Sequence, residues 1–205
     1  MLRRTEPMGR VSPQGNGPIS GRQWGVKTWG AMLQPDLILG GCILELSPEA
    51  IARQGLKGLI LDVDDTLVPT TTAAVSPELK GWVDTMRQTV NIWLVSNNLS
   101  DSRIGGIAQA LDLPYLTSAA KPSRRKLRRA LDGMALPPEA VAMVGDRLFT
   151  DVLAGNRLGL FTVLVQPMVD PSESIRRYPI HALEVWISEL FGATVRPHRD
   201  RPKTP

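Results

Sequence analysis

The sequence is poor in cysteine and has no long apolar run. Cys42 is the only cysteine among 205 residues, so the chain can form no internal disulfide and no cysteine metal site. This is typical of a reducing compartment, and we expect Cys42 to be a small buried residue. No apolar run approaches the roughly 20 residues that span a bilayer, and no signal-peptide pattern opens the sequence. These absences exclude a disulfide scaffold and favour a protein without a membrane span.

Two nucleotide-binding signatures are also missing. There is no Gly-x4-Gly-Lys-Ser/Thr loop, and no Gly-x-Gly-x-x-Gly follows an expected strand. The two histidines, His181 and His198, lie outside every motif, so we expect neither a ligand role nor a pH switch for them. With 42% apolar residues the chain can bury one core of ordinary size, which predicts a single domain.

The positive charge is concentrated at the two ends. The formal net charge is +4; residues 1–30 contribute +4 and residues 191–205 contribute +3, which leaves −3 for residues 31–190. Both ends are rich in proline, glycine and polar residues, so we predict disordered basic tails over 1–30 and 193–205 around a domain at 31–192. Such tails can hold a protein near anionic lipid or nucleic acid. Solvated ends without a dedicated partner are at least an equal alternative.

Between the tails, short apolar strands alternate with helices. The expected strands are Leu59–Val63, Ile92–Ser96, Tyr115–Ser118, Val141–Gly145 and Phe161–Val165. Ser-Pro-Glu at 47–49 and 76–78 places serine at a helix N-cap and proline at the first helical position, and further helices are expected to open near Ser100, Pro122 and Phe149. The alternation predicts an α/β fold with a Rossmann-like, doubly wound parallel sheet.

The first expected strand runs into an acidic cluster. Apolar residues Leu59–Leu61 are followed by Asp62, Asp64 and Asp65. Carboxylates that crowd at one turn repel one another, so a bound cation is their natural partner. An acidic turn or helix N-cap is the simpler alternative. A calcium loop would need a carboxylate at its twelfth position, which is Ala73, so a catalytic aspartate is the better interpretation.

Further polar residues follow the first four expected strands. They are Thr66 after the first strand, Ser96 and Asn97 after the second, Lys121 after the third, and Asp146 and Asp151 after the fourth. Each alone has a structural explanation, such as helix entry for Ser96 or a surface position for Lys121. Because ligands of a doubly wound sheet bind beyond the carboxyl ends of its strands, we expect these side chains to share one crevice.

The order of acid pair, serine, lysine and acid pair resembles the haloacid dehalogenase (HAD) superfamily of phosphohydrolases. The matching motifs are Asp62-Val63-Asp64-Asp65-Thr66, Ser96, Lys121 and Gly145-Asp146 with Asp151. A phospho-accepting receiver domain is the nearest alternative, because it also carries acids, a hydroxyl and a lysine. Its lysine comes last, however, whereas Asp146 and Asp151 follow Lys121 here.

The resemblance implies a role for each residue. Asp62 would attack phosphorus and form an aspartyl-phosphate, and Asp64 would act as general acid and then as general base. Lys121 and Ser96 would contact the oxygens of the transferred phosphoryl group. An acid at position 64 argues against the dehalogenase and ATPase branches, which have no alkoxide to protonate, and favours a phosphatase.

The resemblance also implies a magnesium ion. Its ligands would be Asp62, the backbone carbonyl of Asp64 and Asp146, with Asp151 as a ligand or directly behind the ligands. The residues expected to contact the rest of the substrate are Thr66, Asn97, Arg124 and Arg147.

Four segments resemble one subgroup, the YqeG-like HAD phosphatases. They are Gln34-Pro35-Asp36-Leu37, Val95-Ser96-Asn97-Asn98, Ala120-Lys121-Pro122 and the run 145–157. This subgroup is similar to the phosphatidylglycerophosphate phosphatases of mitochondria and plastids, and the resemblance covers roughly residues 31–190. Asp65 stands where asparagine is common and Arg147 where glutamine is common, which can shift substrate preference.

The spacing of the motifs leaves no room for a cap domain. About 30 residues separate Asp62 from Ser96 and about two dozen separate Ser96 from Lys121, and a helix and a strand take up most of each interval. A site without a lid is open, so it can serve a phosphate carried on a membrane headgroup, a protein or a nucleic-acid end.

We therefore predict a magnesium-dependent phosphomonoesterase that acts on phosphatidylglycerophosphate. A phosphoprotein, a nucleic-acid end or a soluble phosphoester is the alternative substrate, and an RNA- or partner-binding module without catalysis is the alternative class. The five cations within 124–129 suit an anionic membrane and a solvated helix equally well, and an apolar stripe from Leu183 to Phe191 is expected to dock on the core. We expect a cytoplasmic protein and do not expect nucleic acid as its partner; peripheral membrane contact, organelle targeting and oligomeric state stay open.

Overall fold

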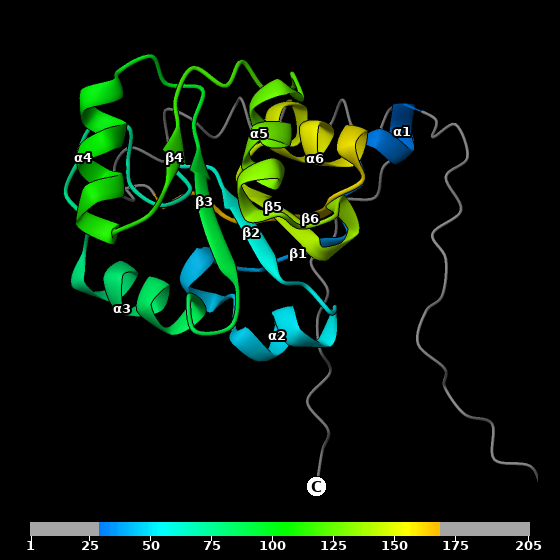
Figure 1. Cartoon of the computed structure of the whole chain (residues 1–205), viewed down its shortest axis with the longest axis horizontal. Helices are drawn as coiled ribbons and strands as arrows, with labels where there is room; N and C mark the ends of the chain where they lie inside the picture. The colour runs from blue at the N-terminus through cyan, green and yellow to red at the C-terminus, as the bar shows by residue number, and fades with distance from the viewer. Residues whose placement is uncertain (1–28, 169–205) are drawn as a thin grey trace, which may run out of the picture.

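The computed structural model describes residues 29–168, which form a six-stranded parallel sheet (Figure 1). The strands are β1 (Leu37–Ile38), β2 (Gly58–Leu61), β3 (Asn91–Val95), β4 (Tyr115–Leu116), β5 (Val141–Gly145) and β6 (Phe161–Leu164). Their order in the sheet is β1-β6-β5-β2-β3-β4, and each neighbouring pair is parallel. The predicted Rossmann-like α/β fold is confirmed.

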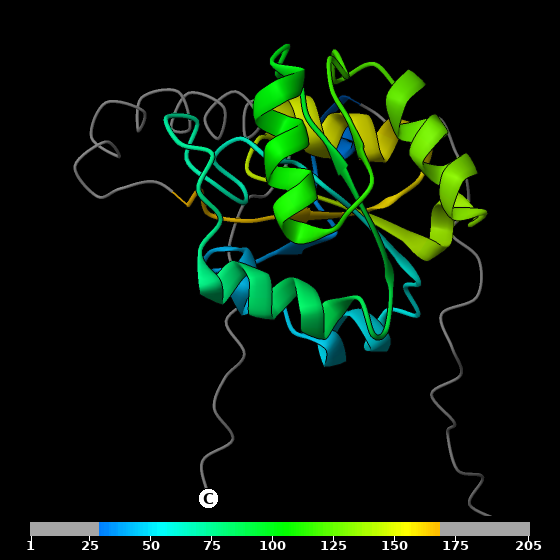
Figure 2. The same ribbon diagram turned by 60° about the vertical axis from the view of Figure 1, so that its left-hand side comes forward.

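Helices cover both faces of this sheet. They are α1 (Trp29–Met32), α2 (Pro48–Arg53), α3 (Pro77–Met86), α4 (Asp101–Leu111), α5 (Arg125–Met134) and α6 (Leu153–Leu158), with 3-10 turns η1 (Ile43–Glu45) and η2 (Pro138–Ala140) and a π-helical turn η3 (Leu148–Val152). In Figure 1, α2 and α3 lie on one side of the strands and α5 and α6 on the other. The turned view in Figure 2 shows the same two helical layers around the sheet.

The strands are buried on both faces, which explains their continuous apolar sequences. Along β2, Leu59 and Leu61 pack with α3 and α4 in one core cluster, whereas Ile60 packs with α5 and α6 in the other. Successive side chains of a strand point to opposite faces, so one short strand contributes to two cores. This arrangement anchors the acids that follow Leu61.

The predicted helix caps are present. The hydroxyl of Ser47 accepts a hydrogen bond from Ala50 N at 3.2 Å, and that of Ser76 accepts one from Leu79 N at 3.1 Å. Ser100 caps α4 in the same way at 3.4 Å. β2 ends at Leu61, two residues before its predicted end, and β3 ends at Val95, one residue before its predicted end. Asp62 N nevertheless donates to Val144 O of β5 at 2.9 Å.

The sequence pattern missed β1 because two residues are too short to show a period. The segment is attached to β6 by Asp36, whose Oδ2 accepts hydrogen bonds from Thr162 N at 2.9 Å and Thr162 Oγ1 at 3.1 Å. Asn156 Nδ2 donates to Met32 O and Gln34 O, each at 2.9 Å. Asp36 and Asn156, both within the motif segments, thus hold the N-terminal segment on the domain.

Between Asp62 and Lys121 the chain forms only α3, β3, α4 and β4 with their loops, so no cap domain is inserted there. Cys42, the residue directly before η1, is half-buried and free, not fully buried as expected. None of the helices within residues 29–168 combines the length and apolar character needed to cross a bilayer. The predicted tails and the stripe from Leu183 to Phe191 lie outside the described residues.

Candidate active site

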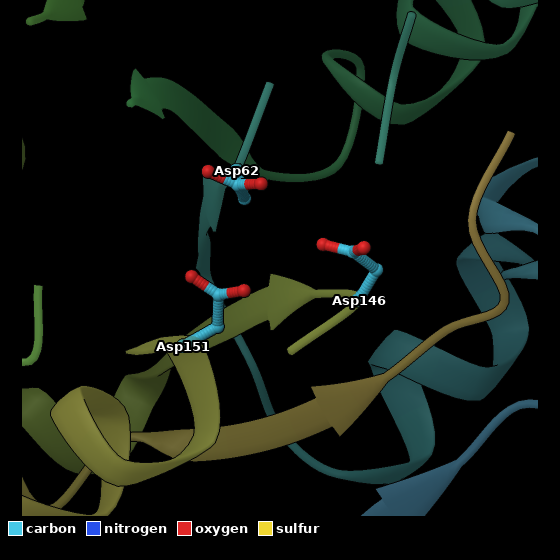
Figure 3. Close-up of side chains that lie close together, drawn as sticks. All are labelled: Asp62, Asp146 and Asp151. Atoms are coloured by element: carbon cyan, nitrogen blue, oxygen red, sulfur yellow. The ribbon is translucent and has the colours of Figure 1, made fainter. Parts of the chain in front are cut away.

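Three acids and a lysine meet where the strands end. Asp62 directly follows β2, Asp146 follows β5, Asp151 lies in η3, and Lys121 lies in the loop after β4. All four side chains are buried. One carboxylate oxygen from each of the three acids lies within 4.8 Å of the other two, and Figure 3 shows the carboxylates around a common space. The sequence therefore placed these residues on one edge correctly.

Lys121 is the buried cation of this cluster. Its Nζ lies 2.5 Å from Asp62 Oδ1 and 2.7 Å from Asp151 Oδ1, and it donates to Val95 O at 3.0 Å. Burial alone would lower the pKa of Lys121, but the carboxylates of Asp151 and Asp62 raise it above its usual value. The ammonium group is therefore charged at neutral pH.

Asn97 fixes the backbone that carries this lysine. Its Oδ1 accepts a hydrogen bond from Lys121 N at 2.7 Å, and its Nδ2 donates to Lys121 O at 3.2 Å. The side chain expected to bind substrate is thus engaged in positioning Lys121, although it also lines the crevice. Direct contact of Asn97 with substrate stays a prediction.

The acids carry more negative charge than Lys121 neutralises. Burial, together with the nearby carboxylates of Asp62 and Asp151, raises the pKa of Asp146 to about 8. Burial also raises the pKa of Asp62 to about 6, although Lys121 opposes this. Oxygen ligands that repel one another in a buried pocket suit a hard divalent cation such as Mg²⁺. Asp62, Asp146 and Asp151 could hold the ion.

Gly145 makes room for one of these acids. A Cβ atom at Gly145 would lie 2.4 Å from Asp151 Cγ, so a side chain and the Asp151 carboxylate cannot share this space. Asp151 Oδ2 also accepts a hydrogen bond from Arg147 N at 3.2 Å, which ties η3 to the end of β5. The Gly-Asp pair seen in the sequence therefore has a steric cause.

Thr66 lies beneath the acids. It is fully buried, and its Oγ1 lies 3.3 Å from both Asp62 Oδ2 and Asp146 Oδ1. The hydroxyl has a single hydrogen, so it donates to one of these two oxygens at a time. Because Asp62 follows β2 and Asp146 follows β5, Thr66 links the ends of these two strands. Its predicted contact with substrate stays a prediction.

Asp64 is held by three donors, two from the loop after β3 and one from α4. Ser96 Oγ donates to its Oδ2 at 2.8 Å, while Asn98 Nδ2 and Arg103 Nη1 reach its Oδ1 at 3.3 and 2.5 Å. Ser96, expected to contact phosphate, is thus engaged with Asp64 in this structure. The contact of Ser96 with phosphate stays a prediction.

Arg103 was missed by the sequence reasoning. It lies in the first turn of α4 and belongs to none of the motifs. Because it is far from Asp64 along the chain, no sequence pattern indicated that the two side chains would pair. Besides its ion pair with Asp64, its Nη2 donates to Pro69 O at 2.9 Å and its Nε to Thr72 O at 3.0 Å. One side chain thus joins α4, Asp64 and the loop that follows it.

Asp65 organises the same loop. It is buried with φ of 64°, its Oδ1 accepts a hydrogen bond from Thr70 N at 3.0 Å, and its Oδ2 lies 3.6 Å from Arg147 Nη2. Left-handed backbone is uncommon outside glycine, and aspartate tolerates it better than most residues. Asp65 is turned toward the loop and Arg147, which suits a structural role.

A crevice of about 260 Å³ opens over these groups. Its lining residues are Asp62, Asp64, Thr70, Asn97, Asn98, Lys121, Arg147 and Thr150. Arg124 lies outside this lining, and its Nη1 donates instead to Arg157 O at 3.2 Å. Of the two arginines expected at the substrate, Arg147 is therefore the one at the crevice.

Comparisons with known proteins agree with this chemistry. A family model described as HAD-hydrolase-like matches residues 118–186. The Bacillus subtilis (strain 168) protein named "Probable phosphatase YqeG" is 34% identical over 137 residues, which cover 66% of this chain and 79% of the relative.

Two further matches are more distant. "Phosphatidylglycerophosphate phosphatase 1, chloroplastic/mitochondrial" of Arabidopsis thaliana is 26% identical over 153 residues, which cover 68% of this chain but only 44% of the relative. A crystal structure of an uncharacterised protein from Listeria monocytogenes serotype 4b aligns with a TM-score of 0.45 and 16% identity, over 62% of this chain and 99% of that chain. The strand order of the sheet and the match to the YqeG protein establish the fold.

Proposed function

The chain belongs to the YqeG-like group of HAD phosphatases, and on this basis we propose that it is a magnesium-dependent phosphatidylglycerophosphatase. The observation that carries the proposal is the buried cluster of Asp62, Asp146 and Asp151 around Lys121, with Asp64 beside it. This set contains a nucleophile, an acid/base, a cation and a metal site within one small crevice.

The reaction proceeds in two displacements. One carboxylate oxygen of Asp62 attacks phosphorus, the bond from phosphorus to the alkoxide oxygen breaks, and Asp64 gives its proton to that oxygen. Asp64 then takes a proton from water, whose oxygen attacks phosphorus and releases phosphate and free Asp62. For the first proton transfer Asp64 must leave its donors Asn98 and Arg103 and enter the step protonated.

Lys121 neutralises charge on the transferring oxygens, since its Nζ already lies 2.5 Å from the nucleophilic carboxylate. Mg²⁺ held by Asp62, Asp146 and Asp151 would offset the repulsion between the anionic nucleophile and the anionic phosphate.

Two observations support a lipid substrate. One relative is named as a phosphatidylglycerophosphate phosphatase, and no cap domain is inserted between Asp62 and Lys121. An open crevice can receive a headgroup that stays in its membrane, so we place the enzyme at a membrane surface on the cytoplasmic side. A phosphoprotein, a nucleic-acid end or a soluble phosphoester fits the same open site and is the alternative substrate.

The test is a phosphatase screen with Mg²⁺ on phosphatidylglycerophosphate in vesicles and on soluble phosphomonoesters. We expect turnover that EDTA and Asp62→Asn each abolish, and a preference for the lipid. Asp84→Asn, an exposed acid on α3, is the matched control and should keep wild-type turnover. Activity that survives in Asp62→Asn would contradict the mechanism, and preference for soluble esters would remove the lipid assignment. Salt-dependent RNA binding without turnover would favour the binding-module alternative.

A further inference from the structure

Arg147 is a partly exposed cation at the rim of the acidic crevice. Its side chain is 45% exposed, whereas that of Lys121 is 1% exposed. Of the residues that line the crevice, these two alone are cationic. Lys121 is engaged with the carboxylates at the floor, so Arg147 is the cation that an arriving ligand meets at the opening.

The contacts of Arg147 leave its guanidinium donors available. Nη2 lies 3.6 Å from Asp65 Oδ2 and Nε lies 3.8 Å from Asp146 Oδ2, which are ion-pair distances beyond hydrogen-bond length. Within residues 29–168 we find no hydrogen bond from this guanidinium, which has five N–H donors. The two carboxylates hold the charge in place while the donors can bind an anion.

Other arginines near the crevice are engaged elsewhere. Arg103 is paired with Asp64 and two backbone carbonyls, and Arg124 donates to Arg157 O. Neither lines the crevice. A second anionic group on the substrate would therefore find its partner in Arg147.

The size of the crevice indicates that a second anionic group of the substrate would lie at the rim. Its volume of about 260 Å³ is below the roughly 300–1,000 Å³ of pockets that enclose whole drug-sized ligands. It can take the phosphate that is cleaved and a short adjoining segment, so the rest of the substrate would extend past the partly exposed Arg147.

We propose that Arg147 is a specificity-determining residue that binds a phosphodiester carried by the substrate near its scissile phosphomonoester. This inference rests on the proposed phosphatase function and narrows its substrate class to esters with two neighbouring phosphates. Guanidinium suits this role because its planar donors pair with two phosphate oxygens at once.

The test uses two water-soluble esters with the same kind of leaving group: glycerol 3-phosphate and the deacylated headgroup glycerophosphoglycerophosphate. The ratio of kcat/KM for the second ester to that for the first is compared among variants. Arg147→Gln should lower this ratio about tenfold or more, because a charge-assisted hydrogen bond is lost, and Arg147→Lys should restore part of it. Arg128→Gln, an exposed arginine of α5, is the matched control and should leave the ratio unchanged.

The outcomes separate the two proposals. An equal loss on both esters in Arg147→Gln, or an unchanged ratio, would overturn the phosphodiester site while phosphatase activity stands. If the wild-type enzyme cleaves neither these esters nor phosphatidylglycerophosphate in vesicles, the proposed function fails. Calorimetric binding of the same two esters then decides the inference: Arg147→Gln must weaken binding of the diphosphorylated ester alone. A melting temperature close to that of the wild type confirms that the variant is folded.

Discussion

At the scale of residues, Asp64, the proposed general acid, is surrounded by three hydrogen-bond donors. Its two oxygens accept hydrogen bonds from Ser96, Asn98 and Arg103, and its side chain is only 16% exposed. The Arg103 guanidinium, at 2.5 Å, is the only charged group among these three donors. The same arginine binds the loop through Pro69 O and Thr72 O. Arg103 is therefore a positioning residue for the acid/base and its loop.

We predict that Arg103→Met lowers kcat about tenfold or more and the free energy of unfolding by about 2 kcal/mol, since it leaves a half-buried carboxylate without its charged partner. Steady-state kinetics and urea denaturation measure the two effects. Arg103→Lys keeps the charge and should recover part of both. A kcat in Arg103→Met within twofold of wild type would show that Asp64 needs no such partner.

The raised pKa of Asp146 makes the stability of the protein, and the proposed metal binding, depend on pH. Because its pKa in the folded protein, about 8, lies above the ordinary 3.8, the native state holds this proton more tightly than the unfolded chain does. Without metal, the contribution of Asp146 therefore lowers the free energy of unfolding as the pH rises from about 4 to about 8. A Mg²⁺ ion held by Asp146, as proposed, would have to displace this proton, so its binding would be favoured above pH 8.

We predict that Mg²⁺ raises the melting temperature more at about pH 9 than at about pH 6. Thermal unfolding with and without Mg²⁺ at each pH checks this without any activity assay. Asp146→Asn should abolish most of the Mg²⁺ effect at both pH values. A Mg²⁺ shift that is equal at the two pH values would contradict the assignment of Asp146 as a ligand.

At the scale of elements, the site depends on how closely β5 approaches the turn η3. The Asp151 carboxylate packs over Gly145, where a Cβ atom would lie 2.4 Å from Asp151 Cγ. Gly145 is the last residue of β5, and Asp151 lies within η3, so both residues are held by regular backbone structure. The position of Asp151 is therefore set by backbone packing as much as by its own hydrogen bonds.

Gly145→Ala should displace Asp151, lower kcat about tenfold or more, and cost about 1–3 kcal/mol of stability through overpacking. Gly106→Ala is the matched control, because a Cβ there on α4 would meet no atom within 4 Å. In a helix interior that control should stabilise the protein slightly. Kinetics and urea denaturation of the two variants are the measurement, and equal behaviour would refute the steric account.

At the scale of the whole molecule, a large apolar side chain is exposed beside the crevice. Leu99 is 82% exposed, and it is the one large exposed hydrophobic residue found within residues 29–168. It directly follows Asn97 and Asn98, which line the crevice. On α5, Arg125, Arg128 and Arg129 are exposed while Leu127 and Leu131 are buried, so this helix presents cations to solvent.

If the crevice faces a membrane, Leu99 can insert into it beside the substrate headgroup. We predict that Leu99→Ser lowers activity on phosphatidylglycerophosphate vesicles about tenfold, because burying a leucine contributes about 1.5–3 kcal/mol. Activity on glycerol 3-phosphate should not change, and Leu99→Ile should behave like wild type on both. A parallel loss on the soluble ester would mean that Leu99 acts on the site and not on the membrane.

Much of the site was predictable because each motif lies at the end of a strand. Hydrophobic strands and capped helices in alternation determine a parallel sheet, and a parallel sheet brings the carboxyl ends of its strands to one edge. Asp62, Lys121, Asp146 and Asp151 could therefore be assigned to one crevice without coordinates. Their shared position follows from local sequence patterns and from the regularity of the sheet.

The tertiary structure alone decided which partner each side chain has. The pairing of Arg103 with Asp64, the engagement of Ser96 with the same acid, and the contact of Arg147 with Asp65 join residues that are tens of positions apart. Such contacts depend on how helices and loops pack over the sheet edge, and on rotamers chosen by that packing. No short sequence period encodes them, which is why Arg103 was missed and Arg124 was placed at a crevice that it does not line.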